Sequence, residues 1–385
     1  MESRREFLRR LGVGAVGIAL GGCVARPTSA QRRPPNVVFV LLDDMGWSDP
    51  ACYGHPFHET PNIDHLARQG MRFTDAYAAC PVCSPTRASI MAGQYPARVG
   101  ITDFIPGHWR PYEKLRVPTN RTQYLPLEIV TIAEALRAAG YATGHVGKWH
   151  LGGADHEPQM QGFDLVRLAG QNRTDKQVTA FTDSAIEFIE ANVERPFFLH
   201  LSHHSVHIPL EAPADLVTKY ENKPKPTTGV NNPVYAAMVE HVDYNIGRVL
   251  ARLDELDLSD NTLVIFFSDN GGLRQMYTGE GPIVTTNAPL RSEKGTLYEG
   301  GIRVPLIVRW PGVVRPRRVC ATPVTSVDFY PTLLEIAGAE RPAGQVLDGR
   351  SLLPLLQQTG RFENRALYWH YPHYHHSTPA GAIRE

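Results

Sequence analysis

The stretch "NVVFVLLDD", residues 36–44, decides the fold, because an unbroken apolar run ends abruptly at two carboxylates. A short apolar run without alternation is typical of a β-strand that is buried on both faces, as in a parallel sheet covered by helices. A second run of this kind, "TLVIFFS" at residues 262–268, also ends in polar residues. Together the two runs predict a sheet whose carboxyl ends carry polar side chains.

Helix signals alternate with these strands along the chain. Thr60 and Pro61 supply an N-cap and a first-turn proline, Thr131 and Glu134 form a capping box, and residues 232–256 have helical periodicity. The alternation predicts an α/β fold, namely a three-layer α/β/α sandwich with a large, mainly parallel central sheet. Ligands of such folds bind beyond the carboxyl ends of the strands, so we expect the functional residues there.

Composition and charge narrow the class of protein. The chain has 385 residues, 42% of them hydrophobic, and no net formal charge, which describes a globular protein large enough for a substantial core. A neutral balance gives no electrostatic footprint for nucleic acid, so we expect no nucleic-acid partner. The five cysteines are scattered and do not form the spacing pattern of a disulfide framework.

The amino terminus resembles an export signal. Residues 1–22 place Arg4 and Arg5 before a short apolar run, the arrangement of a twin-arginine signal, and the run is too short to span a bilayer. "LGGC" resembles a lipobox, whose Cys23 would carry the lipid; a plain cleaved signal is the alternative. Residues 23–35 read as a tether. We therefore expect an exported protein of the periplasm or cell envelope, with the membrane contacted only through the lipid anchor.

The polar residues at the two strand ends are candidate metal ligands. They are Asp43 and Asp44 after the first strand, and Asp269 and Asn270 after the second. Buried adjacent carboxylates are costly unless a positive group neutralises them, and an oxygen-rich set suits Ca²⁺ or Mg²⁺ better than zinc. Each pair alone could be a turn or a helix cap. Both pairs on one sheet favour a metal.

Several cationic side chains follow other predicted strands. "GKWHLG" carries Lys148 and His150, "HHSVHIP" carries three histidines of which we favour His207, and "RSEKG" carries Lys294. A single lysine or histidine is usually a surface group or a satisfied core residue. A set of them opposite a divalent ion would instead form a pocket for a tetrahedral oxyanion such as sulfate or phosphate.

The stretch "ACPVCSPTR", residues 79–87, allows three interpretations. Cys80 and Cys83 have the spacing of a redox pair at a helix start. They could also be half of a zinc site, although no second Cys-x-x-Cys exists. The third interpretation takes Cys83, Pro85 and Arg87 as one unit, Cys-x-Pro-x-Arg.

In this third interpretation the chain resembles the sulfatase family, in which the cysteine of Cys-x-Pro-x-Arg is oxidised to formylglycine by a formylglycine-generating enzyme. The resemblance extends from residue 36 to about residue 384 and implies an alkaline-phosphatase-like fold. It is carried by segments in the family order: "VVFVLLDDMGWSDPACYG", "TPNIDHLARQGMRFTDAYA", "CSPTRASIMAGQYPARVG", "YATGHVGKWHLG", "VIFFSDNGG", "KGTLYEGGIRVPLIVRWPG" and "DFYPTLLEIAG".

The resemblance also implies a role for each matching residue. Calcium would be held by Asp43, Asp44, Asp269, Asn270 and the modified Cys83. Arg87 and His150 would position and help activate the hydrated formylglycine, a gem-diol that attacks sulfur and later re-forms the aldehyde. The sulfate ester would be contacted by Lys148, His207 and Lys294.

The carboxyl terminus departs from the family pattern. We expect a catalytic domain at residues 36–365, and at 366–385 only the start of a small C-terminal subdomain that is otherwise missing. This last segment contains four histidines that could line the cleft or lie on the surface: His370, His373, His375 and His376.

The resemblance implies hydrolysis of sulfate esters, with a sulfated carbohydrate or an aryl sulfate as substrate. Two alternatives stay open. One is a phosphodiester or phosphonate hydrolase of the same superfamily, which can share the metal and the formylglycine. The other is a non-catalytic lipoprotein that uses a truncated sulfatase fold to bind glycans. A redox lipoprotein ranks last, because it leaves the other motifs unexplained.

Overall fold

The computed structural model describes residues 33–107, 114–119, 121–169, 175–275, 281–360 and 362–385. Residues 34–385 form one compact unit, which is described below. The expected export signal, the lipid-bearing Cys23 and most of the tether lie outside the described residues. Within the described part of the chain, no helix combines the length and the apolar character needed to cross a bilayer.

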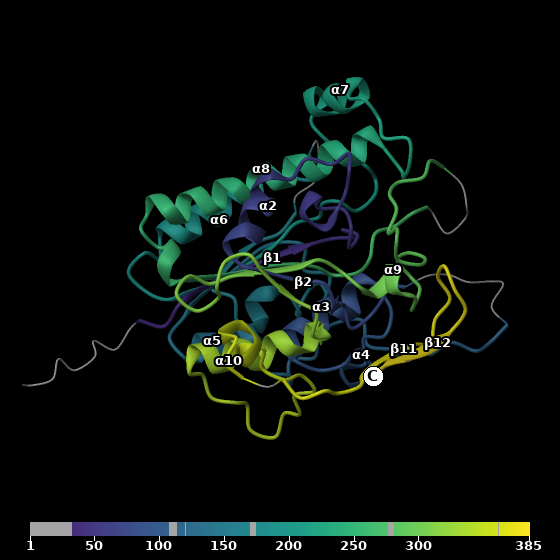
Figure 1. Cartoon of the computed structure of the whole chain (residues 1–385). Coiled ribbons are helices and arrows are strands. Elements are labelled where there is room, and N and C mark those ends of the chain that lie inside the picture. Colours follow the sequence, from purple (N-terminus) through teal and green to yellow (C-terminus); the bar gives the residue numbers. More distant parts are fainter. Residues whose placement is uncertain (1–32, 108–113, 120, 170–174, 276–280, 361) are drawn as a thin grey trace, which may run out of the picture. The chain divides into compact units, whose positions relative to one another are not determined.

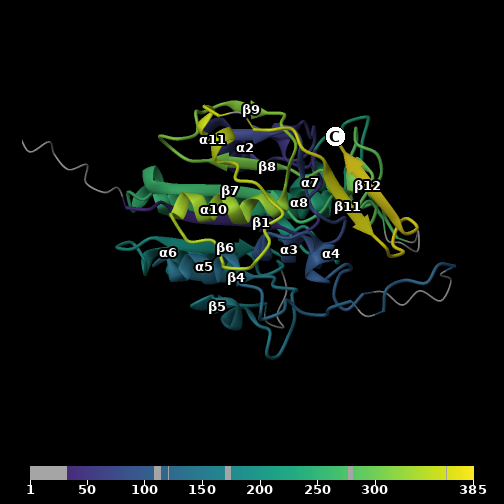
Figure 2. The same cartoon turned by 90° about the horizontal axis from the view of Figure 1, so that it is seen from below.

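An eight-stranded sheet forms the centre of this unit (Figures 1 and 2). Strand β8 is antiparallel to both of its neighbours, and the other pairings are parallel. In spatial order the strands are β5 (Leu165–Arg167), β4 (Ala142–Gly147), β6 (Phe197–Ser202), β1 (Asn36–Leu42), β7 (Thr262–Ser268), β8 (Leu306–Arg309), β2 (Met71–Phe73) and β9 (Arg318–Cys320).

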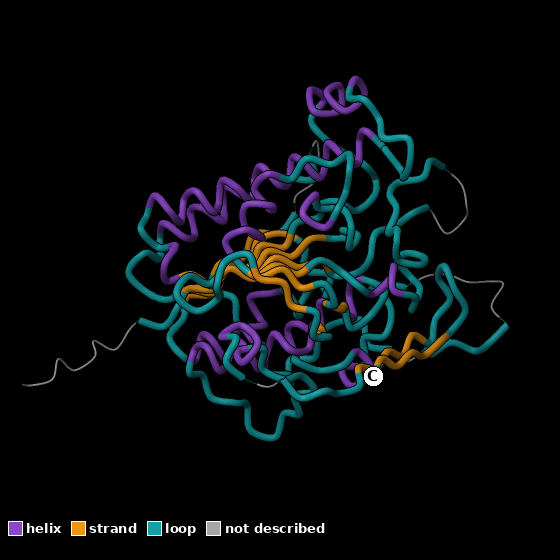
Figure 3. The backbone as a smooth tube through the Cα atoms, in the orientation of Figure 1, coloured by secondary structure: helices purple, strands orange, loops and turns teal. Residues whose placement is uncertain are grey.

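Helices cover both faces of the sheet, because the side chains of each central strand alternate between two apolar cores. On β1, Val38 and Val40 join the core under one helical layer, whereas Val37 and Phe39 join the core under the other. Figure 3 shows the sheet between the two helical layers. The first layer contains α2 (Pro61–Gln69), α6 (Val178–Glu190) and α8 (Pro233–Glu255), with α7 (Ala214–Asn222) packed on α8. The second contains α3 (Cys83–Ala92), α5 (Ile132–Ala138), α10 (Phe329–Ala337) and α11 (Leu353–Gln357).

The predicted three-layer α/β/α sandwich with a mainly parallel sheet is therefore confirmed. The predicted capping box is also present: the Thr131 hydroxyl accepts from the Glu134 backbone N–H, and the Glu134 carboxylate accepts from the Thr131 N–H. It fixes the start of α5.

Three shorter sets of elements surround the carboxyl edge of the sheet. They are the pair β3 (Ala76–Tyr77) and β10 (Val324–Thr325), the short helices α4 (Pro96–Val99) and α9 (Glu299–Ile302), and the hairpin β11 (Leu367–Tyr371) and β12 (Ala380–Arg384). The hairpin buries Leu367, Trp369 and Tyr371. Trp369 donates from Nε1 to the carbonyl of Ala78, so the hairpin packs beside the segment that leads into α3. The expected division into domains at residue 365 stays a prediction.

Candidate active site

The four acidic and amide residues that follow β1 and β7 lie together, because the two strands are adjacent and parallel with Leu42 opposite Ser268. The Asp44 N–H donates to Asp269 Oδ1 at 3.2 Å. Asn270 donates from Nδ2 to Asp44 Oδ1 at 2.7 Å. All four side chains are buried: Asp43, Asp44, Asp269 and Asn270.

Cys83 and Arg87 enter the same site from α3. Cys83 is the first residue of this helix, and Arg87 lies one turn later on the same face. The Arg87 guanidinium is 2% exposed and donates from Nε at 2.9 Å to Asp269 Oδ2, which Nη2 also approaches to 2.7 Å. Its Nη1 donates to Ser202 Oγ at 2.6 Å and to the Lys148 carbonyl at 3.0 Å. Arg87 thus ties α3 to the ends of β4, β6 and β7.

Two lysines neutralise the aspartates that follow β1. Lys148 Nζ donates to Asp43 Oδ2 at 2.6 Å, and Lys294 Nζ donates to Asp44 Oδ1 at 2.6 Å. Burial alone would raise the pKa of Asp43, but the positive charges of Lys148, His207, Arg87 and Lys294 hold it well below its usual value. Burial alone would likewise lower the pKa of Lys294, which the Asp44 carboxylate instead raises. Asp43, Lys148 and Lys294 are therefore charged at neutral pH.

The geometry fixes the tautomer of His150. Its Nε2 lies 2.6 Å from the carbonyl of Ile105, an acceptor only, so Nε2 carries the proton. Its Nδ1 lies 3.3 Å from Cys83 Sγ and therefore faces that atom as an acceptor. Burial, together with the charge of Lys148, lowers the pKa of His150 well below its usual value, so the ring is neutral. The backbone of His150 has φ 59°, and that of Asp44 has φ 64°, both in the left-handed region that is uncommon for residues other than glycine.

Of the three histidines that follow β6, only His207 faces the site. Its Nε2 lies 3.6 Å from Asp44 Oδ2, and the side chain is 31% exposed. His203 and His204 instead pack near the ring of Phe181. The spacing of the three histidines in the sequence could not by itself show which of them faces the site.

The carboxylate cluster fits a hard divalent cation. Three buried oxygens there have no hydrogen-bond partner: Asp43 Oδ1, Asp44 Oδ2 and Asn270 Oδ1. Ligand atoms of Asp43, Cys83 and Asp269 also lie within 4.8 Å of one another. Buried polar atoms are normally hydrogen-bonded, and buried carboxylate and amide oxygens left without such a bond are the donor type that a hard divalent ion binds.

A cavity of about 320 Å³ opens onto these residues. From the predicted set it is lined by Cys83, Lys148, His150, His207 and Lys294. Asp43, Asp44, Arg87, Asp269 and Asn270 lie beneath this layer.

The remaining residues that line the cavity were either not predicted as site residues or were left undecided between the cavity and the surface. Phe104, Ile105, Ile208 and Leu273 are apolar loop residues that carry no sequence signal for a site. Ser202 does not line the cavity, but its hydroxyl accepts a hydrogen bond from Arg87. In the sequence, only its place at a strand end could have marked it as a site residue.

Of the four histidines of the carboxyl-terminal segment, two line the cavity, one is buried outside it and one lies on the surface. His375 and His376 line the cavity. His373 is buried and lies 2.9 Å from the Thr102 hydroxyl, and His370 is exposed on β11. The position of the β11–β12 hairpin decides this division.

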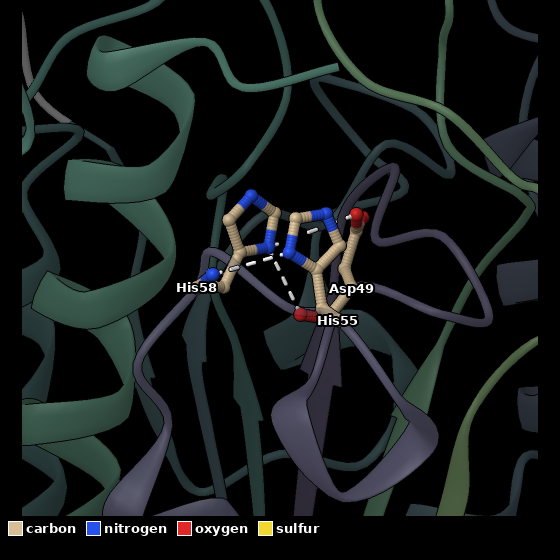
Figure 4. Close-up of side chains that lie close together, drawn as sticks. All are labelled: Asp49, His55 and His58. Carbon is tan, nitrogen blue, oxygen red and sulfur yellow. Dashed lines mark hydrogen bonds and ion pairs between the residues drawn. The ribbon is translucent and has the colours of Figure 1, made fainter. Parts of the chain in front are cut away.

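A second group of metal-type side chains lies apart from the cavity: Asp49, His55 and His58 (Figure 4). The two imidazole rings stack with centroids 3.4 Å apart and planes 10° apart, so their in-plane lone pairs run parallel and do not converge on one ion. His58 Nδ1 lies 2.9 Å from the Asp49 carbonyl, and the Asp49 carboxylate accepts from Tyr235 and Thr285. These hydrogen bonds stabilise the loop that follows β1.

Cys80 lies outside the cavity lining. It is 1% exposed, and burial raises the pKa of its thiol well above the usual value. Cys80 and Cys83 are both free thiols. Burial also raises the pKa of the Cys83 thiol, so the two cysteines differ in position: Cys83 lines the cavity, whereas Cys80 packs in an apolar cluster with Val82 and Tyr371.

Comparisons with known proteins agree on one family. The family model described as Sulfatase matches residues 35–339. A protein described as Sulfatase from Formosa agariphila is 34% identical over 89% of this chain and 76% of its own length. Human Arylsulfatase A is 34% identical over 90% of this chain and 72% of its own length. The crystal structure of Ps i-CgsB in complex with k-i-k-neocarrahexaose superposes with a TM-score of 0.77 at 29% identity, over 91% of this chain and 82% of that one.

Proposed function

The chain belongs to the sulfatase family and is a sulfuric ester hydrolase, and from this premise we propose that it removes sulfate from sulfated carbohydrate. The proposal includes a formylglycine derived from Cys83 and a calcium ion. The observation that carries it is the convergence of Cys83, His150 and two lysine–aspartate pairs on one cavity.

Calcium would be held by the four residues after β1 and β7 and by the side chain that replaces the Cys83 thiol. The fit rests on the three unpartnered oxygens and on the oxygen-rich donor set. The ion supplies positive charge that lowers the pKa of an oxygen ligand and offsets charge on sulfuryl oxygens. Lys148 and Lys294 already neutralise two of the carboxylates, so both lysines would be partly released towards substrate when the ion binds.

Formylglycine formed from Cys83 would, in its hydrated form, supply a hydroxyl nucleophile towards the sulfur of the ester. The neutral His150 presents Nδ1 to the position of the Cys83 side chain and can accept a proton from a hydroxyl there. The Ile105 carbonyl keeps the other ring nitrogen protonated, so the accepting atom stays on the correct side. Arg87 holds Asp269 and the amino end of α3 in register.

The cations at the cavity provide the sulfate-binding groups. Lys148 and Lys294 pair with different aspartates and both line the cavity, as does His207. Charge-assisted hydrogen bonds from such groups to the three outer sulfuryl oxygens would stabilise the negative charge that grows during displacement.

A carbohydrate substrate is supported by two observations. The Ps i-CgsB structure named above contains k-i-k-neocarrahexaose, which is a property of that protein. In this chain the cavity lining combines charged side chains with apolar and imidazole side chains, among them Phe104, Leu273, His375 and His376. Such a mixed lining suits a sugar ring, which has one apolar face and hydroxyls at its edge.

The central test compares two cysteine variants. Cys83→Ala should abolish hydrolysis of an aryl sulfate and of a sulfated oligosaccharide, whereas Cys80→Ala should keep both activities. Incubation with a calcium chelator should remove the activity, and added calcium should restore it. Mass spectrometry of the peptide around Cys83 should show the aldehyde in active preparations. An active preparation whose Cys83 is an unmodified thiol would refute the proposal that formylglycine supplies the nucleophile.

The alternatives predict different outcomes in the same assays. A phosphodiester or phosphonate hydrolase would turn over an aryl phosphodiester faster than an aryl sulfate. A non-catalytic glycan-binding protein would carry the modified Cys83, bind calcium and hydrolyse neither ester.

For the amino terminus we propose export, lipid anchoring at Cys23, and modification of Cys83 by a formylglycine-generating enzyme before transport. The support is the order of the arginine pair, the apolar run and the cysteine in the sequence. A labelled fatty acid should be incorporated by the wild-type chain and not by Cys23→Ser. Equal incorporation by both chains would refute the assignment.

A further inference from the structure

Five arginines gather at one edge of the sheet, far from the cavity, and are called here the arginine patch: Arg68, Arg72, Arg315, Arg317 and Arg318. Arg72 is half-buried and the other four are exposed. The patch joins segments about 250 positions apart in the sequence, because the Arg317 N–H donates to the Arg68 carbonyl at 3.1 Å. The Arg318 N–H donates to the Gly70 carbonyl at 3.1 Å. Both bonds use only backbone atoms of Arg317 and Arg318, whereas the Arg72 guanidinium lies over the Tyr53 ring, 4.9 Å from its centroid.

Two adjoining hollows of about 300 and 750 Å³ share Arg68 and Arg317, and the smaller one is also lined by Arg72 and Arg318, whereas Arg315 lines neither. None of the five forms an ion pair within the described residues. Many other surface arginines do, including Arg98 with Asp348 and Arg252 with Glu190. The carboxylates that border the hollows are Asp64 and Asp260. In a chain with no net formal charge, the patch is therefore a local excess of positive charge.

The patch and the cavity lie at different places on the sheet. Arg68 is the second-last residue of α2, just before β2, and residues 315–317 lead into β9, the last strand on this side of the sheet. The cavity lies beyond the carboxyl ends of β1 and β7, and four strand spacings, roughly 19 Å, separate β1 from β9 across the sheet. The cavity and the two hollows share no lining residue.

The point where the chain enters this unit lies at the same edge. Asn261 donates from Nδ2 to the Pro34 carbonyl at 3.3 Å, and its neighbour Asp260 borders the larger hollow together with Arg317. In the sequence, residues 23–33 that precede this point contain three further arginines and follow the apolar run.

Protection of a sheet edge explains only part of the patch. Strand β9 is the last strand of the sheet, and a charged residue such as Arg318 on an edge strand discourages pairing with another chain. Arg68 lies on a helix, and Arg315 and Arg317 precede the strand, so none of these three blocks the edge (Figure 2).

We propose that the arginine patch docks on the surface of a bilayer that contains anionic lipid, through guanidinium contacts to lipid phosphates. The side chain of arginine forms paired hydrogen bonds to phosphate oxygens, and basic clusters near an anionic surface add to the binding nearly independently. No residue that lines the cavity borders the two hollows, so docking through the patch leaves the cavity lining outside the contact. The proposal stands apart from the proposed reaction and does not depend on it.

The test measures co-sedimentation of the full-length chain with vesicles of phosphatidylcholine containing phosphatidylglycerol, and with phosphatidylcholine alone. The patch variant combines Arg68→Gln, Arg317→Gln and Arg318→Gln. A control variant removes the same charge from three exposed arginines outside the patch: Arg116→Gln, Arg274→Gln and Arg291→Gln. The lipid concentration is set so that about half of the wild-type chain sediments. Each patch arginine should contribute about fivefold to partitioning, and the triple change on the order of 100-fold.

The expected result is loss of anionic-vesicle binding by the patch variant only, with unchanged hydrolysis of an aryl sulfate as proof of folding. Equal binding by the patch variant and the wild-type chain would overturn the proposal, as would an equal loss in both variants. Retained vesicle binding together with weaker retention of the patch variant on immobilised heparin would also overturn it, and would identify a sulfated polysaccharide as the partner.

Discussion

Arg87 allows the most direct test of how the site is held together. Replacing it by Met keeps much of the side-chain volume but removes the guanidinium, which makes two contacts to Asp269 and two to the end regions of β4 and β6. Asp269 would then be a buried carboxylate without its main partner. Breaking a buried pair in this way costs about 3–5 kcal/mol.

The expected loss can be measured by thermal unfolding in the presence of a chelator, so that no metal replaces the missing charge. For a chain of this size, a loss of about 4 kcal/mol lowers Tm by about 5 °C. Arg98→Ala is the matched control, because Arg98 is 49% exposed and its pair with Asp348 is worth less than about 1 kcal/mol. Arg87→Lys should lie close to Arg87→Met, since an ammonium cannot make the forked contact.

A double variant separates the stability lost through the unpaired charge of Asp269 from the other effects of replacing Arg87. Adding Asp269→Asn to Arg87→Met removes the unpaired carboxylate, so part of the lost stability should return. The reasoning would be refuted if Arg87→Met lowered Tm no more than Arg98→Ala, or if the double variant were less stable than the sum of the two single changes.

Three further outcomes are expected. Lys294→Met should lower kcat/KM for an aryl sulfate by roughly 10- to 100-fold, because one charge-assisted contact to the sulfate is lost. The rise in Tm that calcium causes should persist in this variant. Loss of that rise would show that Lys294 contributes to metal binding instead. Burial lowers the pKa of His145 to about 3, below its unfolded value near 6.5, so the folded state keeps the ring neutral and stability is lost as pH falls from about 6.5 towards 3. Between pH 7 and 5, denaturant unfolding of His145→Phe should therefore lose about 2 kcal/mol less than the wild type, and an equal loss would contradict the assignment. Thr131→Ala should cost about 1 kcal/mol by removing the capping box of α5, whereas a neutral change would show that the cap contributes nothing.

The sequence by itself determined the features that depend on neighbours in the chain. The apolar run of β1 and the capping box of α5 are local, and both lie where the periodicity and the cap signals put them. The relation between Cys83 and Arg87 is also local, because residues four apart on a helix share a face. The order of the sequence segments also indicated the sulfatase family.

Only the tertiary structure decided what meets across long separations. The protonated nitrogen of His150 is set by the Ile105 carbonyl on a distant loop, and His375 rather than His370 reaches the cavity because of how a hairpin packs. The arginine patch forms because β9 pairs with β2 beside the end of α2. Local patterns set which face a side chain occupies, whereas strand pairing and packing in three dimensions set what that face meets.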